Sequence, residues 1–196
     1  MKLGQTPSQT VGPYFAYGLT GEQYGYALKG IADGAVARPE TEGQHIRIEG
    51  RVFDGAGAPI NDALIEIWQA DSRGRYAHPA DGRGSNAAFK GFGRQGTGPH
   101  PEHKFIFDTV KPGRVDDRQA PHINVIVLMR GQLVHSFTRI YFSDEAAANA
   151  RDPVLLAVPA ERRHTLIATR EAGSGKPVYR FDIHMQGAEE TVFFDA

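Results

Sequence analysis

The residues best suited to chemistry lie in the stretch KPGRVDDRQAPHINVIVL, residues 111–128. The stretch leaves an alternating apolar segment, turns at a Pro-Gly pair, crosses a polar loop and enters a second alternating segment at His122. Side chains two residues apart on a strand share a face, so we expect His122 and Asn124 to point the same way. A His-x-His pair would clamp a transition metal, whereas asparagine is a poor ligand for Fe, Zn or Cu. The stretch therefore indicates either a metal site or a place where one has been lost.

Few other patterns carry chemistry. The chain has eight histidines and no cysteine, so a metal site would need His, Tyr or carboxylate ligands. No histidine pair has the HExxH or Hx3H spacing of a helical zinc site, and neither GxSxG nor a P-loop occurs. The glycine-rich GFGR at Gly91–Arg94 lacks the strand–turn–helix setting of a nucleotide site. The segment around His122 is therefore the strongest candidate for a functional site.

Composition limits the kind of protein that these residues serve. With 196 residues and a net charge of −1, the chain fits one globular domain and offers no electrostatic reason to bind nucleic acid or an anionic membrane. No apolar run is long enough to span a bilayer. The N-terminal MKLGQTPSQT has no apolar segment behind its lysine, so we expect no signal peptide and a cytoplasmic protein.

Alternation of apolar and polar residues predicts the strands that must position the site. Glycine and proline are frequent, at 23 and 12 residues, which favours an all-β class with many turns. The segment 79–101 reads as a long glycine-rich loop, 144–150 as a short helix capped by Ser143 or Asp144, and 21–32 can hold another short helix. About eight strands are expected, at the spacing of a β-sandwich: 45–53, 63–69, 103–110, 122–129, 133–142, 165–170, 178–185 and 191–194.

The first part of the chain has no helical or strand period. It nevertheless carries Tyr14, Phe15 and Tyr17, and such aromatic residues argue against simple disorder. We therefore divide the chain into an arm with loops, residues 1–44, that lies across another surface and contacts a partner chain, and a β-sandwich domain, residues 45–196.

Several motifs together resemble the intradiol ring-cleavage dioxygenases, non-haem ferric enzymes that open catechol rings between the two hydroxyls. GRVFDGAGAPINDALIEIWQADSRGRYAH, FKGFGR, FDTVKPG, APHINV and TRIYF follow the family's order and spacing. The resemblance implies an all-β, prealbumin-like sandwich of the intradiol dioxygenase type, with an N-terminal arm and short helices. The positions that match the family signature in the first motif are Gly50, Ala63, Glu66, Trp68, Gly74 and Tyr76.

The resemblance also identifies the iron ligands of catalytic family members, which are two tyrosines and two histidines. Tyr76 matches the first tyrosine and His122 the first histidine. The second tyrosine corresponds to Val115, which has no donor atom, and the second histidine to Asn124. Tyrosinate is a hard anionic donor suited to Fe(III), so its loss weighs heavily against iron binding.

Two further departures surround the same position. Catalytic chains carry arginine where this chain has Gln119, and tend to carry glutamine where it has Arg139. An added cation beside an empty site repels Fe(III) further. We therefore expect a vestigial site that binds no metal and is catalytically inactive, formed by Tyr76, Val115, Gln119, His122 and Asn124.

Some family members pair an iron-binding beta chain with a homologous chain whose own site is vestigial, and this chain resembles the second kind. The resemblance implies Fe(III) held by a beta subunit partner and not by this chain. It implies protocatechuate, a dihydroxybenzoate, and O2 as the reactants of the hetero-oligomer. The isolated chain would be inactive.

The same resemblance assigns substrate-binding residues to this chain. Thr10, Gly12, Pro13 and Tyr14 would line the partner's pocket, with the Gly-Pro pair making a rigid turn. Arg130, in the turn after the His122 strand, would reach the substrate, and a guanidinium suits the carboxylate of a benzoate. Read without the family, Tyr14 is an interface anchor and Arg130 a solvated turn residue.

Two other functions remain open from the residues. One is a self-sufficient metalloenzyme that uses Tyr76, His122 and a third ligand, Asp116 or Asp117. The other is a non-enzymatic, transthyretin-like β-sandwich binding module. Iron content of the chain expressed alone tests the first, and co-expression with a beta homologue tests the second.

Overall fold

The computed structural model describes residues 11–12 and 14–195. Thr10 and Pro13, both expected to line a partner's pocket, lie outside the described residues. No helix in the described part of the chain is both long and apolar enough to cross a bilayer.

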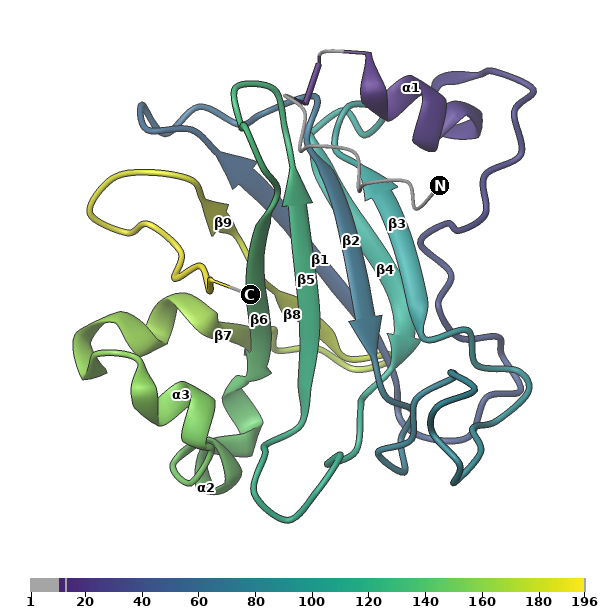
Figure 1. The fold of residues 1–196 in the computed structure, drawn as a ribbon, viewed down its shortest axis with the longest axis vertical. Helices are drawn as coiled ribbons and strands as arrows, with labels where there is room; N and C mark the ends of the chain where they lie inside the picture. The colour runs from purple at the N-terminus through teal and green to yellow at the C-terminus, as the bar shows by residue number, and fades with distance from the viewer. Residues whose placement is uncertain (1–10, 13, 196) are drawn as a thin grey trace, which may run out of the picture.

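The described residues form one continuous sheet of nine strands (Figure 1). Its order is β3-β2-β5-β6-β7-β8-β1-β4, and β9 pairs with β1 beside this path. The parallel pairing of β6 with β7 joins the halves β3-β2-β5-β6 and β7-β8-β1-β4. The strands are β1 (His45–Phe53), β2 (Leu64–Gln69), β3 (Phe92–Gly96), β4 (Lys104–Val110), β5 (His122–Leu128), β6 (Ser136–Phe142), β7 (Ile167–Arg170), β8 (Val178–Arg180) and β9 (Ile183–His184).

The core lies between these halves, and the alternation of each strand explains it. In β1 every second residue is buried, and β4 and β5 follow much the same pattern. Apolar side chains that face inward therefore meet across one core, whose burial drives the fold. The all-β class and the sandwich type are confirmed.

A segment before β1 closes the open side of the sheet, between its end strands β3 and β4. The Val36 amide donates to the Asp108 carbonyl of β4 at 2.9 Å, and the Arg94 amide of β3 donates to the Asp33 carbonyl at 3.0 Å. Gly93 makes room for this closure, because a Cβ there would lie 2.6 Å from Val36 and 3.0 Å from Phe107. Part of the predicted arm is thus built into the sheet.

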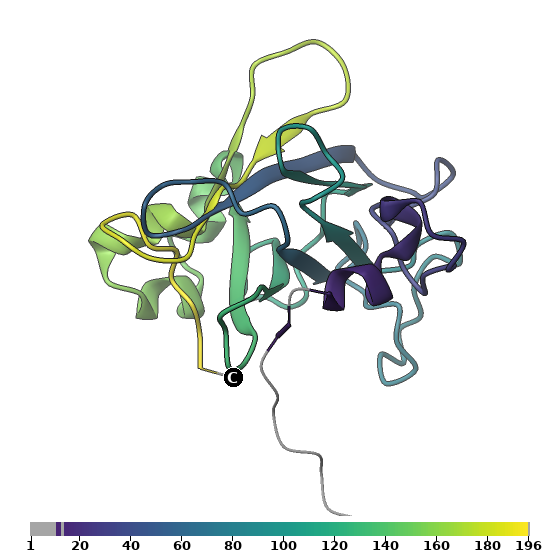
Figure 2. The same cartoon turned by 90° about the horizontal axis from the view of Figure 1, so that it is seen from above.

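Short helices flank the sheet at two separate places. Figures 1 and 2 show α1 on one side of the molecule and the α2–α3 group on the opposite side. The helices are α1 (Phe15–Leu19), α2 (Ala146–Asn149) and α3 (Pro153–Ala157), with the 3-10 turns η1 (Gly21–Tyr24), η2 (Ser143–Glu145) and η3 (Ala160–Leu166).

Three expectations about elements were wrong. The loop predicted over 79–101 contains strand β3, because FGRQG pairs with β2 although two of its five residues are glycines. The segment 191–194 contributes only an isolated bridge between Phe194 and Phe137. Neither Ser143 nor Asp144 caps a helix through its side chain, whereas Asp152 caps α3 by accepting from two backbone amides.

Candidate functional site

Strand register gathers the predicted site residues at one end of β5. Trp68 of β2 lies opposite Asn124 of β5, and Asn124 lies opposite Arg139 of β6. His122, two residues earlier on β5, lies opposite Tyr141. Ile123 and its alternate neighbours enter the core, so the predicted sidedness of this strand is confirmed.

Arg139 forms the centre of this group. Its Nε donates to Asn124 Oδ1 at 3.1 Å, and its Nη1 donates to Gln119 Oε1 at 3.1 Å. Gln119 in turn donates through Nε2 to Asp116 Oδ2 at 2.9 Å. Three positions that depart from the catalytic pattern are therefore joined directly by hydrogen bonds, with a guanidinium among them.

His122 is buried and bonded through one ring nitrogen. Its Nδ1 lies 2.9 Å from the Ala120 carbonyl oxygen, and its ring lies 6.0 Å from the ring of Tyr141. Burial lowers the pKa of His122 below its ordinary 6.5; the bond to Ala120 opposes the shift and nearby Arg139 adds to it. Burial therefore disfavours the charged form of this imidazole.

Asp152 fixes the loop that leads into His122. It is fully buried, accepts from the Ala120 amide through Oδ2 at 2.8 Å and from the Tyr141 hydroxyl through Oδ1 at 3.1 Å. The same carboxylate caps α3. Burial raises the pKa of Tyr141 to about 12, so this hydroxyl stays protonated and donates. One carboxylate thus couples the loop before His122 to α3.

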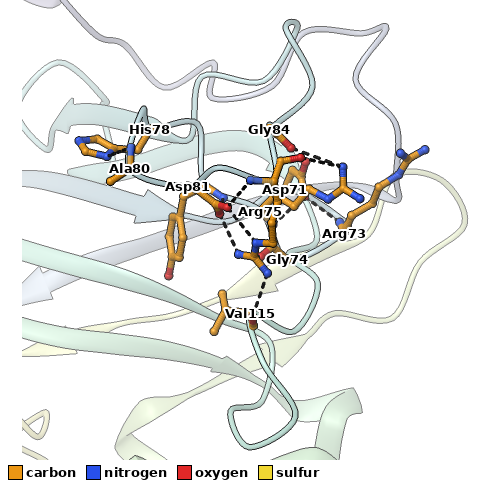
Figure 3. Close-up of polar contacts among 11 residues, drawn as sticks. Asp71, Arg73, Gly74, Arg75, His78, Ala80, Asp81, Gly84 and Val115 are labelled. Atoms are coloured by element: carbon orange, nitrogen blue, oxygen red, sulfur yellow. Dashed lines mark hydrogen bonds and ion pairs between the residues drawn. The ribbon is translucent and has the colours of Figure 1, made fainter.

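Tyr76 is held through its backbone by Asp81, which Figure 3 shows in one polar network with Gly74 and Val115. Its amide donates to Asp81 Oδ2 at 2.8 Å, and Arg83 pairs with Asp81 while donating to the Val115 carbonyl at 3.2 Å. The Tyr76 ring stacks on Trp68 at 5.7 Å between centroids. Burial raises the pKa of the Tyr76 hydroxyl, while Arg139 and a hydrogen bond from Asn124 oppose that shift.

Gly74 allows the two loops of this network to approach each other. Its φ is +76°, a conformation that favours glycine, and a Cβ there would lie 1.8 Å from the Arg114 carbonyl oxygen. No side chain fits in that space.

These residues do not suit the iron of the family's catalytic chains. Only Tyr76 and His122 supply donors of the required kind, and Asn124 is already engaged by a cation. Among the residues that the structure describes, no cluster of three or more His, Asp or Glu side chains could hold a metal ion. Asp116, one of the alternative third ligands, accepts instead from Gln119 and from the amides of the same loop.

A cavity of about 530 Å³ opens beside the group, on the outer face of β3, β2, β5 and β6. Its lining is mostly apolar and aromatic, with Arg139 and Asn124 at one side. Trp68 was identified at a signature position, but this cavity was not predicted, because Val154 and Phe194 reach it from distant parts of the chain. Its lining is Glu66, Ile67, Trp68, Phe92, Asn124, Ile126, Phe137, Thr138, Arg139, Val154 and Phe194.

The predicted substrate-binding residues lie at the other end of β5. Arg130 is eight residues from His122, roughly 25 Å along an extended chain. The Val11 amide donates to the Gln132 carbonyl at 3.3 Å, which brings the arm beside the Arg130 turn. Tyr14 is 79% exposed, and Gly12 is partly exposed.

Asp62 is the partner of Arg130 that sequence reasoning missed. The Arg130 Nε forms an ion pair with Asp62 Oδ2, while the arginine side chain stays 59% exposed and the aspartate is 12% exposed. The two residues are 68 positions apart, and no sequence signal links them. The pair orients a guanidinium that still faces outward.

Comparison with known proteins agrees with this geometry. Residues 19–187 match the family model described as Dioxygenase. The chain is 57% identical to the protocatechuate 3,4-dioxygenase alpha chain of Burkholderia cepacia, over 98% of both chains. It is 30% identical to the beta chain from the same organism, over 82% of this chain and 72% of that one.

Solved structures support the fold. The intradiol ring-cleavage dioxygenase from Tetranychus urticae matches with a TM-score of 0.59 and 17% identity, over 93% of this chain and 94% of that chain. The resemblance inferred from the sequence motifs is thereby confirmed. The chain belongs to the intradiol ring-cleavage dioxygenase family, in the group of the protocatechuate 3,4-dioxygenase alpha chains.

Proposed function

We propose that this chain is the non-iron-binding alpha subunit of a protocatechuate 3,4-dioxygenase. The complete enzyme cleaves protocatechuate with O2 to 3-carboxy-cis,cis-muconate in aromatic catabolism. The full-length match to an alpha chain carries this proposal. Similarity to a beta chain supports a partner of the same family.

The vestigial site explains why a partner is needed. With Val115 and Asn124 at donor positions and Arg139 hydrogen-bonded to Asn124, this chain cannot supply the ligand set that Fe(III) requires. We assign the iron to the beta subunit, where it would supply the Lewis-acid and redox chemistry of ring cleavage. The task of this chain is to shape and charge the substrate pocket.

Arg130 is the residue that we expect to bind the substrate carboxylate. It is more than half exposed, and its ion pair with Asp62 uses Nε, which leaves the terminal nitrogens to donate outward. Gly12 and Tyr14 lie on the arm that approaches the same turn, and we extend the assignment to Thr10 and Pro13 by family resemblance. Together they would orient the ring of a dihydroxybenzoate.

Purification with and without the partner tests the proposal. We expect a beta homologue and this chain to co-purify, with iron and ring-cleavage activity in the complex and neither in this chain alone. If no complex forms, the transthyretin-like binding module becomes the better interpretation. If the chain alone binds about one iron and shows the colour of tyrosinate–Fe(III), it is a metalloenzyme in its own right.

Kinetics of the complex test Arg130. Loss of a charge-assisted hydrogen bond costs about 1.5–3 kcal/mol, so Arg130→Ala should raise KM for protocatechuate at least about tenfold. Arg130→Lys should recover part of the loss, because it keeps the charge without the planar fork. Arg151→Gln, a change at an exposed arginine near α3, serves as the control. Unchanged kinetics in Arg130→Ala would remove the substrate role.

A further inference from the structure

We propose that the cavity on the outer face of β3, β2, β5 and β6 is a second ligand site, which binds a small aromatic carboxylate with its carboxylate on Arg139. This site lies within the chain itself, at the opposite end of β5 from Arg130. The proposal therefore goes beyond the role of this chain in a partner's pocket and does not depend on it.

Two rows of side chains on this face of the sheet supply most of the cavity floor, and Arg94, at the end of the second row, lies outside the lining. In the first row Phe92, Trp68, Asn124 and Arg139 follow one another across β3, β2, β5 and β6. The second row, two residues further along each strand, is Arg94, Glu66, Ile126 and Phe137. Because residues two apart share a face, all eight belong to one surface of the sheet.

The shape and lining suit a planar ring. The cavity of about 530 Å³ falls within the range of small-molecule sites. Trp68 and Phe92 are paired across β2 and β3 on its floor. Phe137 and Phe194, which also line the cavity, are joined by an isolated antiparallel β-bridge. Aromatic side chains pack well against the face or edge of another ring.

The charges favour an anion. Glu66 is neutralised by Arg94, whose Nε donates to Glu66 Oε1 at 2.7 Å, and both side chains are largely buried. Arg139 donates to the neutral amides of Asn124 and Gln119. Within the described part of the chain, no carboxylate comes within ion-pair distance of Arg139. Within the cavity lining, Arg139 is therefore a cation with no ion-paired carboxylate.

A carboxylate is the anion that best matches this arrangement. A guanidinium binds a planar carboxylate strongly, and a partly buried cation gains from an anionic partner. A single arginine balances one negative charge, and the lining offers no second cation for a doubly charged phosphate. The ligand class is thus a monoanionic aromatic acid.

Tryptophan fluorescence can test the site directly, because Trp68 is the single tryptophan of the chain and lines the cavity. Titration of the full-length chain with benzoate should give a saturable change in emission. Arg139→Gln should weaken benzoate binding about tenfold or more, as expected for loss of a charge-assisted hydrogen bond. Benzyl alcohol, which lacks the charge, should bind the parent chain as weakly as benzoate binds Arg139→Gln.

Two variants separate the site from general effects on folding. Ile126→Phe narrows the cavity and keeps Arg139, so it should abolish binding, whereas Arg151→Gln should bind benzoate like the parent. Near-ultraviolet circular dichroism checks that each variant is folded. If Arg139→Gln does not fold, Ile126→Phe and the benzyl alcohol comparison decide. The proposal fails if the parent shows no saturable change, or if the folded cavity variants bind benzoate with the parent's affinity.

Discussion

Arg139 donates to Asn124 and Gln119, and the two amides keep it in place beside Tyr76. By the family resemblance, the corresponding space of a catalytic chain would hold anionic donors and Fe(III). In this chain the Arg139 guanidinium, bonded to Asn124 and Gln119, lies beside these positions. Missing ligands are therefore not the single reason why these residues do not suit iron, because Arg139, Asn124 and Gln119 form a hydrogen-bonded arrangement of their own.

Restoring the missing ligands alone should not restore iron binding. In Val115→Tyr/Asn124→His the four-residue donor set is complete, but Arg139 still opposes Fe(III) by several kcal/mol at an effective dielectric constant of about 20. We expect bound iron, with the visible absorption of tyrosinate–Fe(III), only after Arg139→Gln is added. Iron analysis and spectra of the chain expressed alone check this. Iron bound by the double variant would show that Arg139 is no obstacle, and Arg151→Gln in its place is the matched control.

His122 should make stability depend on pH. Because burial lowers its pKa below 6.5, the unfolded chain binds a proton that the folded chain does not, at pH values just below 6.5. Folding stability therefore falls as the pH drops through this interval, by at most about 1.4 kcal/mol per pH unit. Urea unfolding of His122→Gln between pH 7 and pH 5 should show a shallower slope than the parent. A change of the same size in His135→Gln, at an exposed histidine, would contradict the assignment to His122.

At this scale the sequence predicted part of the site. The two-residue period of a strand placed His122 and Asn124 correctly, and the family spacing brought Tyr76 to them. It could not predict the ion pair of Arg130 with Asp62, because two separate turns must meet for it to form. The cavity beside Trp68 was missed for the same reason, since its wall includes residues from the C-terminal segment.

At the scale of elements, the loops before β5 and after β2 decide where the site residues lie. At Gly74 these loops approach each other closely, and Arg83 bridges them by donating to the Gly74 and Val115 carbonyls. Such contacts link segments that no local pattern connects. They explain why a polar loop of irregular sequence holds Tyr76 in one position.

Gly74→Ala and Gly84→Ala form a matched pair that separates strain from crowding. Both glycines have positive φ, at +76° and +69°, so each alanine should cost about 1 kcal/mol of backbone strain. A Cβ at Gly74 also meets the Arg114 carbonyl at 1.8 Å, whereas nothing lies within 4 Å at Gly84. Gly74→Ala should therefore lower the free energy of unfolding by at least about 2 kcal/mol more. If urea unfolding gives both variants the same loss in free energy of unfolding, the two loops can move apart at Gly74 without an energetic cost.

Strands with strong alternation were predicted well, and weakly patterned ones were not. The hairpin of β5 and β6 and that of β7 and β8 follow from their apolar periods and the turns between them. Strand β3 escaped notice because Gly93 and Gly96 remove the side chains that would have marked a period. Its pairing with β2 and with the segment 33–37 depends on tertiary contacts, which no local propensity reveals.

At the scale of the whole molecule, exposed apolar side chains gather in the chain around α1 and η1. Tyr17 packs against Tyr14, Tyr24 and Tyr26, and Leu28 lies against Gly21. The exposed fraction is 54% for Tyr26, 58% for Leu28 and 86% for Ile31. Side chains of this kind mark interaction surfaces when several occur together. They continue the segment proposed to contact the beta subunit.

Charge substitution in this segment should weaken assembly with the beta subunit. Leu28→Asp/Ile31→Asp places two carboxylates where apolar side chains would be buried, at a cost of several kcal/mol to association. Because both side chains are exposed in this chain, its own stability should change little. Leu156→Asp in α3, on the opposite side of the molecule in Figures 1 and 2, is the control. Size-exclusion chromatography of the co-expressed chains should show less complex for the double variant alone. Equal co-elution of both variants with the partner would place the subunit interface elsewhere.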